Sequence, residues 1–274
     1  MIGIIGQGFV GTAVYEGLKT FFDIETFDIA KDSTCDSLEE LVSKTNIIFV
    51  CLPTPMEKDG SCHIGIVDGV LGKINSLSNK NKTIIVKSTI PPGTTSTWNE
   101  KYKNIDVVFN PEFLTEANAI NDFKNQTRII IGGPKNASSR VRRLFVKAFP
   151  KVKIIKTDST YAEMVKYVTN CFLATKVSFA NEMSEICKSL NMDYDKVIEY
   201  AMHDDRLGYS HWSVPGPDGD LGYGGHCFPK DVNALKKLAL ELGCQPRMLE
   251  ATDRKNNEVR KNRDWEDMKG RAII

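Results

Sequence analysis

Residues 3–18 read GIIGQGFVGTAVYEGL, and this stretch decides the fold of the N-terminal half. Gly6, Gly8 and Gly11 have G-x-G-x-x-G spacing, directly after an apolar run and at the opening of a helical pattern. The first glycine permits a tight turn, the second lets a pyrophosphate approach the backbone, and the third lets the helix pack on the strand. Glycine-rich turns also occur without ligands, so the motif indicates a dinucleotide site only because both flanks fit.

An acidic residue follows where a ribose contact is expected. Asp28 ends the next strand-like run, 17 residues after Gly11. A carboxylate there accepts hydrogen bonds from ribose hydroxyls and repels a 2′-phosphate. No arginine follows it to accommodate such a phosphate. The residues therefore predict NAD rather than NADP as the cofactor.

Short apolar, β-branched runs recur through the first half of the chain. They cover residues 1–6, 23–28, 46–52, 82–88, 106–110, 128–133 and 151–156. Runs that are apolar throughout are typical of strands buried on both faces of a parallel sheet. Helical patterns such as 10–20, 37–44 and 137–148 alternate with them. The alternation predicts an α/β fold with a Rossmann-like, doubly wound, mostly parallel sheet.

The pattern changes after residue 157, where more than thirty residues lack glycine and proline. Thr160 and Glu163 have capping-box spacing, which predicts that a helix starts there and runs to about residue 190. Further helices are predicted over 194–202, 229–242 and 247–262. We therefore expect an NAD-binding domain over 1–157 and an all-helical domain over 158–274, built on the long central helix.

Composition excludes several classes of protein. The 274 residues include 36 basic and 35 acidic side chains, a balance that argues against nucleic acid as a partner. No apolar run approaches the ~20 residues that cross a bilayer, and the N-terminus lacks the pattern of a signal peptide. The seven cysteines are odd in number and scattered, without metal-ligand spacing. We expect a soluble, cytoplasmic protein with reduced thiols and no metal.

Two loops and an acidic segment follow predicted strands. Thr54, in a Pro-Thr-Pro sequence, and Thr89 both lie at the carboxyl edge where doubly wound sheets bind ligands. Proline-terminated loops without a function would look the same. Glu112 and Glu116 are four residues apart and share one face if that segment is helical. They are either a solvated helix start or a general base beside a substrate contact.

The long helix carries a lysine and an asparagine one turn apart. A lysine on such a helix is ordinarily exposed, but Lys166 and Asn170 have the apolar neighbours Val165, Val168 and Phe172. Together the pair would form a cationic, hydrogen-bond-donating patch that suits an oxyanion.

Residues 222–231 read GYGGHCFPKD and place Cys227 just before Pro229, a favoured first residue of a helix. A helix N-terminus and the nearby Lys230 favour a thiolate. The glycines around the cysteine predict room for a ligand to reach the sulfur. Cys227 is therefore predicted as a nucleophile, and the other six cysteines as buried small apolar residues.

These motifs occur together and in order. They are GQGFVG, PTP, STIPPGT, NPEFLTE, EMVKYVTNCFLATKVSFANE and GYGGHCFPKD, and they span most of the chain. In this combination the sequence resembles the nucleotide-sugar dehydrogenases. Members of that family oxidise the primary alcohol of a nucleotide-linked hexose to a carboxylate, with two NAD per turnover and a covalent thioester. The resemblance implies a UDP-sugar as substrate, UDP-glucose first, with UDP-N-acetylmannosamine as an alternative.

The resemblance also implies a role for each matched residue. Cys227 would attack the intermediate aldehyde, while Lys166 and Asn170 hold the oxyanion. Asp231 and Thr89 would assist proton removal, and Glu112 would activate water for thioester hydrolysis. The implied NAD contacts are Gly6, Gly8, Val10, Gly11, Asp28, Thr54, Thr89 and Glu116. The implied substrate contacts are Glu112, Phe113, Leu114, Glu116, Lys166, Asn170, Arg206 and Gly224.

The sequence departs from the family pattern at its end. Family members continue into a third, nucleotide-binding domain that would begin about where this sequence stops, so we expect that domain to be lacking. Two other readings stay open: a β-hydroxyacid dehydrogenase that stops at one hydride transfer, and a non-catalytic NAD-binding subunit. Helix 160–190 is expected to pair with its twin in a homodimer.

Overall fold

The computed structural model describes residues 1–79 and 82–274, which divide into two compact units. The first unit contains residues 1–54 and 64–166, and the second contains residues 55–63 and 167–274. The division between the two units, after residue 166, falls inside a helix rather than before it. The domain limits at 157 and 158 stay a prediction.

A seven-stranded sheet forms the centre of the first unit, in the order β2-β1-β3-β4-β5-β6-β7. Every neighbouring pair is parallel except β5 and β6, which are antiparallel. The strands are β1 (Ile2–Ile5), β2 (Ile24–Phe27), β3 (Ile47–Val50), β4 (Lys82–Val86), β5 (Ile105–Phe109), β6 (Arg128–Gly132) and β7 (Lys153–Thr157). Each lies within a predicted apolar run or extends one residue beyond it.

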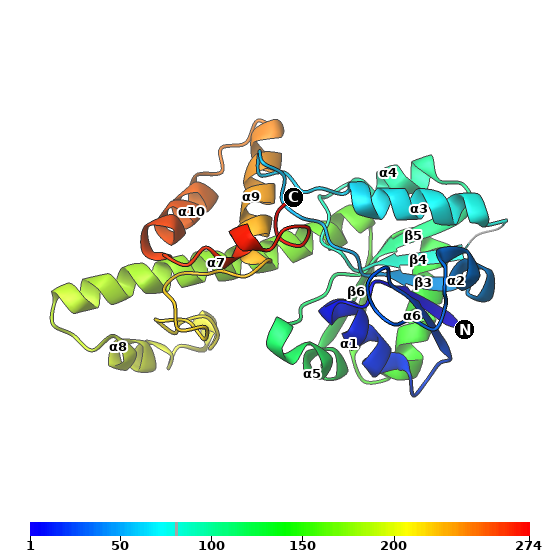
Figure 1. The fold of residues 1–274 in the computed structure, drawn as a ribbon. Coiled ribbons are helices and arrows are strands. Elements are labelled where there is room, and N and C mark those ends of the chain that lie inside the picture. The colour runs from blue at the N-terminus through cyan, green and yellow to red at the C-terminus, as the bar shows by residue number, and fades with distance from the viewer. Residues whose placement is uncertain (80–81) are drawn as a thin grey trace. The chain divides into compact units, whose positions relative to one another are not determined.

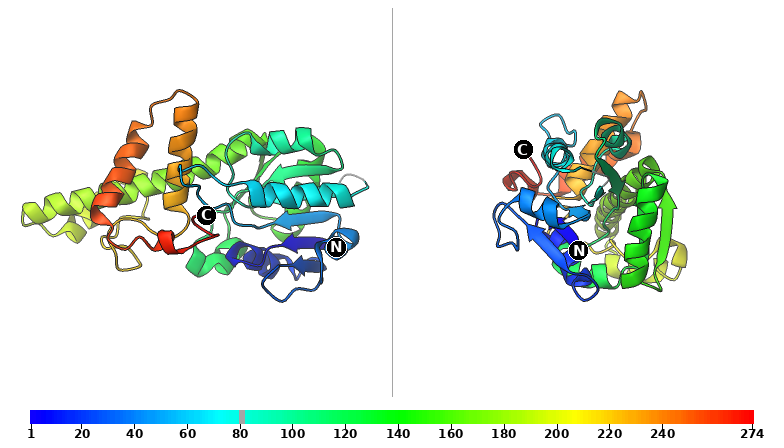
Figure 2. Two further views of the ribbon diagram at one scale, coloured as in Figure 1. Left: turned by 45° about the horizontal axis from the view of Figure 1, so that its top comes forward. Right: turned by 90° about the vertical axis from the view of Figure 1, so that its right-hand side faces the viewer.

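Helices cover both faces of this sheet (Figures 1 and 2). One face carries α2 (Leu38–Lys44), α3 (Gly65–Leu77) and α4 (Thr94–Lys101), and the other carries α1 (Phe9–Leu18), α5 (Ala119–Lys124) and α6 (Lys135–Ala148). Successive strand residues reach opposite clusters: Ile48 and Val50 pack with the first set of helices, and Phe49 packs with the second. Burial on both faces explains the uninterrupted apolar runs, and the predicted fold class is confirmed.

The second unit is helical. Helix α7 (Ser159–Ser189) begins in the first unit and continues into the second, followed by α8 (Tyr194–Ala201), α9 (Phe228–Glu241) and α10 (Arg247–Val259). Short 3-10 turns lie at η2 (Asp205–Leu207) and η3 (Asp264–Asp267). Tyr167, Cys171 and Ala174 of α7 form a core cluster with Val232 and Ala234 of α9. The prediction of an all-helical part built on one long helix is confirmed.

The last residues of the chain pack beside residues 55–63 within the second unit. The Met56 amide donates to the Ala272 carbonyl at 2.7 Å, and the Ile274 amide donates to the Met56 carbonyl at 3.1 Å. These contacts explain why residues 55–63 belong with the helices although they follow a strand of the sheet.

The predicted capping box at the start of α7 is wrong. Thr160 lies inside the helix, and Glu163 reaches a different element. Its buried carboxylate accepts hydrogen bonds from the amides of Gly93 at 2.6 Å and Thr95 at 2.8 Å, at the N-terminus of α4. Glu163 therefore joins two helices of the first unit instead of capping its own.

Within residues 1–79 and 82–274, no helix combines the length and apolar character needed to span a membrane. The same residues contain no group of three or more histidine, cysteine or acidic side chains placed to hold a metal ion.

Candidate active site

The glycine motif forms the turn between β1 and α1. Gly6 has φ +88°, and a Cβ there would lie 2.5 Å from the Cys51 carbonyl oxygen. A Cβ on Gly11 would lie 1.8 Å from the Gly6 carbonyl oxygen, which explains the third glycine as a close approach of helix and turn. Gly8, by contrast, precedes α1 and faces open space. The N-terminus of α1 is thus open to a phosphate group.

Asp28 is tied to the same turn. One carboxylate oxygen accepts the Gln7 amide at 2.5 Å, and the other accepts the Ala30 amide at 2.8 Å. Lys31, a cation that the sequence reasoning did not single out, donates to the Gln7 carbonyl at 2.7 Å. An open helix N-terminus, a carboxylate and an exposed lysine around one turn fit the pyrophosphate and ribose of NAD.

Thr54 and Thr89 lie beyond the carboxyl ends of the neighbouring strands β3 and β4. The Thr54 hydroxyl donates to the Thr89 carbonyl at 2.8 Å, and both side chains are buried. Ser88 makes a second connection, donating its hydroxyl to the Leu52 carbonyl at 2.6 Å. The two loops are therefore joined at the edge where the sheet presents the glycine turn. Val10 lies half-buried in the first turn of α1.

Glu112 and Lys166 form a buried ion pair in the first unit. The Lys166 ammonium lies 2.8 Å from Glu112 Oε1 and 2.7 Å from the Glu112 carbonyl oxygen. The Glu112 side chain is 7% exposed and the Lys166 side chain is 4% exposed. Burial acts to raise the pKa of Glu112, but the charge and hydrogen bond of Lys166 outweigh it, so this pKa is lowered. Glu112 is therefore a carboxylate at neutral pH.

Glu112 and Glu116 do not share a helix face, because the segment that contains them is not one helix. Residues 110–115 are not helical, and a 3-10 turn starts only at Glu116. Glu112 is buried, whereas Glu116 is exposed. The Leu114 amide donates to Glu112 Oε2 at 2.8 Å, so the backbone turns around the buried carboxylate. The ring of Phe113 lies 5.6 Å from the Lys166 ammonium.

Lys87 is a residue of this cluster that the sequence reasoning missed. It follows β4, is fully buried, and donates to Asn110 Oδ1 at 2.8 Å. Burial lowers the pKa of Lys87 to about 8, an effect that the nearby charge of Glu112 partly opposes. A lysine directly after the apolar residues 84–86 of β4 was the available signal. Lys87, Glu112 and Lys166 together place two basic groups around one carboxylate.

Cys227 is the N-cap residue of α9, with Pro229 in the first turn. Its carbonyl accepts the Asp231 amide at 2.9 Å, the first hydrogen bond of that helix. The half-buried thiol therefore stands at the positive end of the α9 dipole, as the sequence predicted.

Asp231 is the acidic residue of the predicted site in the second unit, and it is 1% exposed. Asn170 donates to its Oδ2 at 2.6 Å, and the Lys230 ammonium donates to its Oδ1 at 2.6 Å. Burial acts to lower the pKa of Lys230, but the charge of Asp231 outweighs this and raises it. Lys230 is thus paired with Asp231, which itself lies one helical turn after Cys227.

The glycines before Cys227 serve the protein's own packing more than a ligand's access. A Cβ on Gly222 would lie 2.3 Å from Asn256 Oδ1, and one on Gly224 would lie 2.3 Å from Arg260 Nη2. Gly225 alone faces open space, and its φ of +68° favours glycine for conformational reasons. The expectation that all three glycines leave room at the sulfur is therefore corrected for Gly222 and Gly224.

Arg206 lies in η2 with its side chain 89% exposed. Its guanidinium holds Asp204, with Nε 2.8 Å from Asp204 Oδ1. The other cysteines are less uniform than predicted: Cys35, Cys171 and Cys187 are buried, Cys51 and Cys62 are half-buried, and Cys244 is exposed.

The predicted site residues thus form two groups. Gly6, Gly8, Val10, Gly11, Asp28, Thr54, Thr89, Glu112, Phe113, Leu114, Glu116 and Lys166 belong to the first unit, and Asn170, Arg206, Gly224, Cys227 and Asp231 belong to the second. Lys166 and Asn170 are one turn apart on α7, on either side of the division. Their catalytic and binding roles stay predictions.

The chain is similar to proteins of known name. The chain is 32% identical over 255 residues to UDP-glucose 6-dehydrogenase TuaD of Bacillus subtilis, covering 90% of this chain and 54% of that protein. It is also 32% identical over 256 residues to the UDP-glucose 6-dehydrogenase of Pseudomonas aeruginosa, covering 89% and 55%. The chain thus spans about half the length of these relatives.

The structure is similar to that of a UDP-glucose dehydrogenase from the archaeon Pyrobaculum islandicum. The TM-score is 0.84 at 27% identity, covering 94% of this chain and 68% of that one. Residues 31–149 match the NAD binding domain of the UDP-glucose/GDP-mannose dehydrogenase family, and residues 160–258 match its central domain. NAD is accordingly the cofactor of this chain. The chain belongs to the UDP-glucose/GDP-mannose dehydrogenase family.

Proposed function

We propose that this protein oxidises UDP-glucose to UDP-glucuronate through a covalent intermediate on Cys227. The observation that carries the proposal is the placement of Cys227 at the N-terminus of α9, one turn before the buried Asp231 that Asn170 and Lys230 hold. A nucleophile, an acid–base group and hydrogen-bond donors thus gather within one part of the second unit. Neither a scaffold nor a single hydride transfer requires a cysteine in that setting.

The reaction removes four electrons from one carbon. NAD, when bound, accepts one hydride in each of two oxidation steps. Between them the Cys227 sulfur bonds to the aldehyde carbon, and the resulting thiohemiacetal becomes a thioester when its carbon loses the second hydride. Water then breaks the carbon–sulfur bond, which releases the carboxylate and returns the thiol. The anchor keeps the aldehyde from leaving between the two steps.

The remaining residues provide proton transfer and charge stabilisation. Asp231 accepts the proton of the substrate hydroxyl, and Thr89 assists its removal. Lys166 and Asn170 donate hydrogen bonds to the oxyanion that develops when the sulfur attacks. Glu112, ionised because Lys166 lies beside it, activates the water that cleaves the thioester. Glu116, Phe113, Leu114, Arg206 and Gly224 complete the proposed contacts with NAD and the sugar nucleotide.

We further propose a homodimer formed through α7. Large apolar side chains recur along it at intervals of three, four and seven residues and remain exposed. They are Tyr161, Met164, Val168, Phe172, Phe179 and Ile186. Such a stripe at helical spacing fits a second copy of the same helix. Phe172→Glu should yield a monomer in sedimentation velocity, and a wild-type protein that is monomeric at micromolar concentration would contradict the dimer.

The seven cysteines, none of which forms a disulfide, support a reducing compartment, and we propose the cytoplasm.

The test is the NADH yield per sugar. Purified protein incubated with limiting UDP-glucose and excess NAD should release two NADH per sugar, and Cys227→Ser should not complete the second oxidation. A panel with UDP-N-acetylmannosamine and GDP-mannose identifies the preferred sugar. One NADH per turnover with a fully active Cys227→Ser variant would favour a hydroxyacid-type dehydrogenase. If the protein binds NAD but forms no NADH from any nucleotide sugar, the result would favour a non-catalytic NAD-binding subunit.

A further inference from the structure

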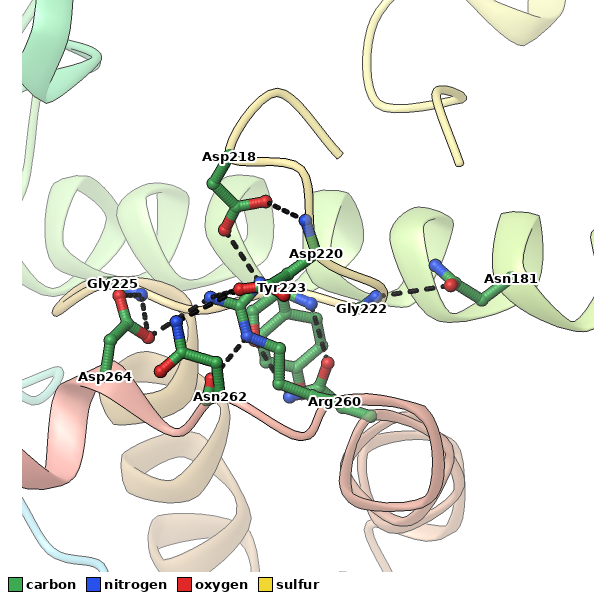
Figure 3. Close-up of polar contacts among 10 residues, drawn as sticks. Asn181, Asp218, Asp220, Gly222, Tyr223, Gly225, Arg260, Asn262 and Asp264 are labelled. Carbon is green, nitrogen blue, oxygen red and sulfur yellow. Dashed lines mark hydrogen bonds and ion pairs between the residues drawn. The ribbon is translucent and has the colours of Figure 1, made fainter. Parts of the chain in front are cut away.

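The loop that precedes Cys227 is held by side chains from other elements. Residues 222, 223 and 225 each donate a backbone amide to a side-chain oxygen, and all the groups lie in the second unit (Figure 3). The acceptors are Asn181 of α7 at 3.2 Å, Asn256 of α10 at 2.7 Å and Asp264 of η3 at 3.1 Å. No strand or helix includes this stretch, so its path is held by these three acceptors together with the Asn256 side-chain amide, which donates to the Tyr223 carbonyl at 3.0 Å, and the buried Tyr223 ring.

Asp264 accepts the Gly225 amide with both carboxylate oxygens, at 3.1 Å each. It also pairs with Arg260, whose Nη2 lies 3.3 Å from Asp264 Oδ1. No other acceptor of the loop is charged. Asp264 is therefore the charged acceptor among the three, and its contact is the nearest in sequence to the thiol, since Gly225 lies two residues before Cys227.

Arg260 connects Asp264 to the start of the same loop. Its side chain is 1% exposed, and Nη1 lies 2.7 Å from Asp218 Oδ2. A second carboxylate, that of Asp220, lies 3.6 Å from Nη2. Burial acts to raise the pKa of Asp218, but the hydrogen bond from Arg260 helps to lower it, so this carboxylate stays ionised. One buried guanidinium thus holds residues 218–220 directly and Gly225 through Asp264.

Gly224 shows how closely this pair approaches the backbone. A Cβ there would lie 2.3 Å from Arg260 Nη2 and 2.4 Å from Asp264 Oδ1. The guanidinium and the carboxylate therefore lie against the Gly224 α-carbon, and any side chain at 224 would displace them. The pair fixes the chain three residues before the thiol.

We propose that Asp264 and Arg260 are positioning residues that hold the 222–225 loop and thereby place the Cys227 thiol at the N-terminus of α9. This inference rests on the proposed function for its catalytic consequence, but the placement itself does not require activity. A misplacement of about 1 Å at a reacting group can cost about a hundredfold in rate. Residues distant from the chemistry can therefore control turnover through this loop.

The direct test compares thiols within one protein. Iodoacetamide labelling followed by peptide mass spectrometry gives the rate at Cys227 relative to the exposed Cys244, between pH 6 and 9. In Asp264→Ala we expect this ratio to change at least threefold and the midpoint of its pH profile to rise, because the thiol leaves the helix N-terminus. Loss of a carboxylate alone would move that midpoint down, so an upward move separates lost placement from lost charge.

Buried cysteines report whether the unit stays folded. Cys171 and Cys187 should remain unlabelled in every variant used. If Asp264→Ala exposes them, Asp264→Asn, which keeps the size and one acceptor oxygen, decides instead. Labelling of Cys171 and Cys187 in Asp264→Asn as well would make the pair a general structural staple and overturn the positioning role.

Steady-state kinetics provide a second test of the proposal. Arg260→Met should lower kcat at least tenfold with KM changed less than threefold, and Arg260→Lys should restore part of kcat. Arg263→Ala is the matched control, since Arg263 lies in the same segment but pairs only at the surface with Glu266. A Cys227 ratio and pH profile within twofold of wild type in folded Asp264→Ala would overturn the proposal. If the wild type oxidises no nucleotide sugar, the proposed function fails, and the thiol ratio still decides the placement.

Discussion

The buried ion pair of Lys166 and Glu112 allows a prediction with a worked magnitude. At 2.8 Å and an effective dielectric constant of about 20, the attraction between two unit charges is about 6 kcal/mol, before the cost of removing both groups from water. Lys166→Met removes the cation and leaves a carboxylate that is 7% exposed. Breaking such a pair on one side costs about 3–5 kcal/mol, and we expect that loss in the free energy of unfolding.

The change in stability caused by Lys166→Met should depend on pH, and the pKa of Glu112 determines its direction. In the wild type the pKa of Glu112 is lowered, so its contribution is present above pH 4.5 and is lost as the pH falls through the folded value. In Lys166→Met burial is no longer offset by Lys166, so the pKa of Glu112 moves up. The deficit of the variant should therefore shrink as the pH is lowered from 8 to 5.

Urea unfolding measures this loss, and the design can confine the signal to the first unit. Trp98 is the tryptophan of that unit, so a background with Trp212 and Trp265 replaced by phenylalanine reports on it by fluorescence. Lys166→Met combined with Glu112→Gln should recover about half or more of the loss, since the buried carboxylate that lost Lys166 is then replaced by a neutral amide. A loss below about 1 kcal/mol, independent of pH, would refute the reasoning.

Three further predictions test other parts of the structure. Gly8→Val should fold with an unchanged melting temperature, because its Cβ faces open space. It should bind NAD at least tenfold more weakly in calorimetry, because the side chain occupies the space left for the pyrophosphate. Gly11→Val should fail to fold, since its Cβ would lie 1.8 Å from the Gly6 carbonyl oxygen. Glu163→Ala should lower the free energy of unfolding by about 1–2 kcal/mol through loss of the acceptors at the α4 N-terminus, with Glu182→Ala as a control at another position on α7; equal effects would contradict the capping role. The wild type should gain stability between pH 8 and 10.5, because the pKa of Lys87 is about 8 when folded and that of an unfolded lysine is near 10.5; Lys87→Met should lack this gain, and identical pH profiles would exclude it.

The uninterrupted apolar runs, alternating with helical patterns, predicted the fold. Both faces of the sheet are covered, so strands such as β3 are apolar at every position, and this local pattern is visible without the structure. Helix α7 was predicted over 160–190 and runs over Ser159–Ser189, since a long stretch without glycine or proline leaves few alternatives. Spacing between glycines likewise predicted the turn before α1 correctly.

Contacts between distant residues account for what the sequence could not show. Glu163 has capping-box spacing with Thr160, but its carboxylate is held by amides about 70 residues earlier in the chain. Lys87 looked like the end of a strand, and its burial beside Asn110 depends on how β4 and β5 pair. Arg260 and Asp264 had no motif at all, because their importance comes only from their approach to Gly224.

The thioester on Cys227 is the claim on which the proposed chemistry depends, and it can be trapped. Glu112→Gln should form the thioester and hydrolyse it slowly, because the group that activates water is then no longer a base. After incubation with UDP-glucose and NAD, intact-mass and peptide spectrometry should find the acyl adduct on Cys227, absent without NAD and absent in Cys227→Ser. Release of two NADH per sugar by Cys227→Ser, or an unmodified Cys227 throughout turnover, would contradict the account.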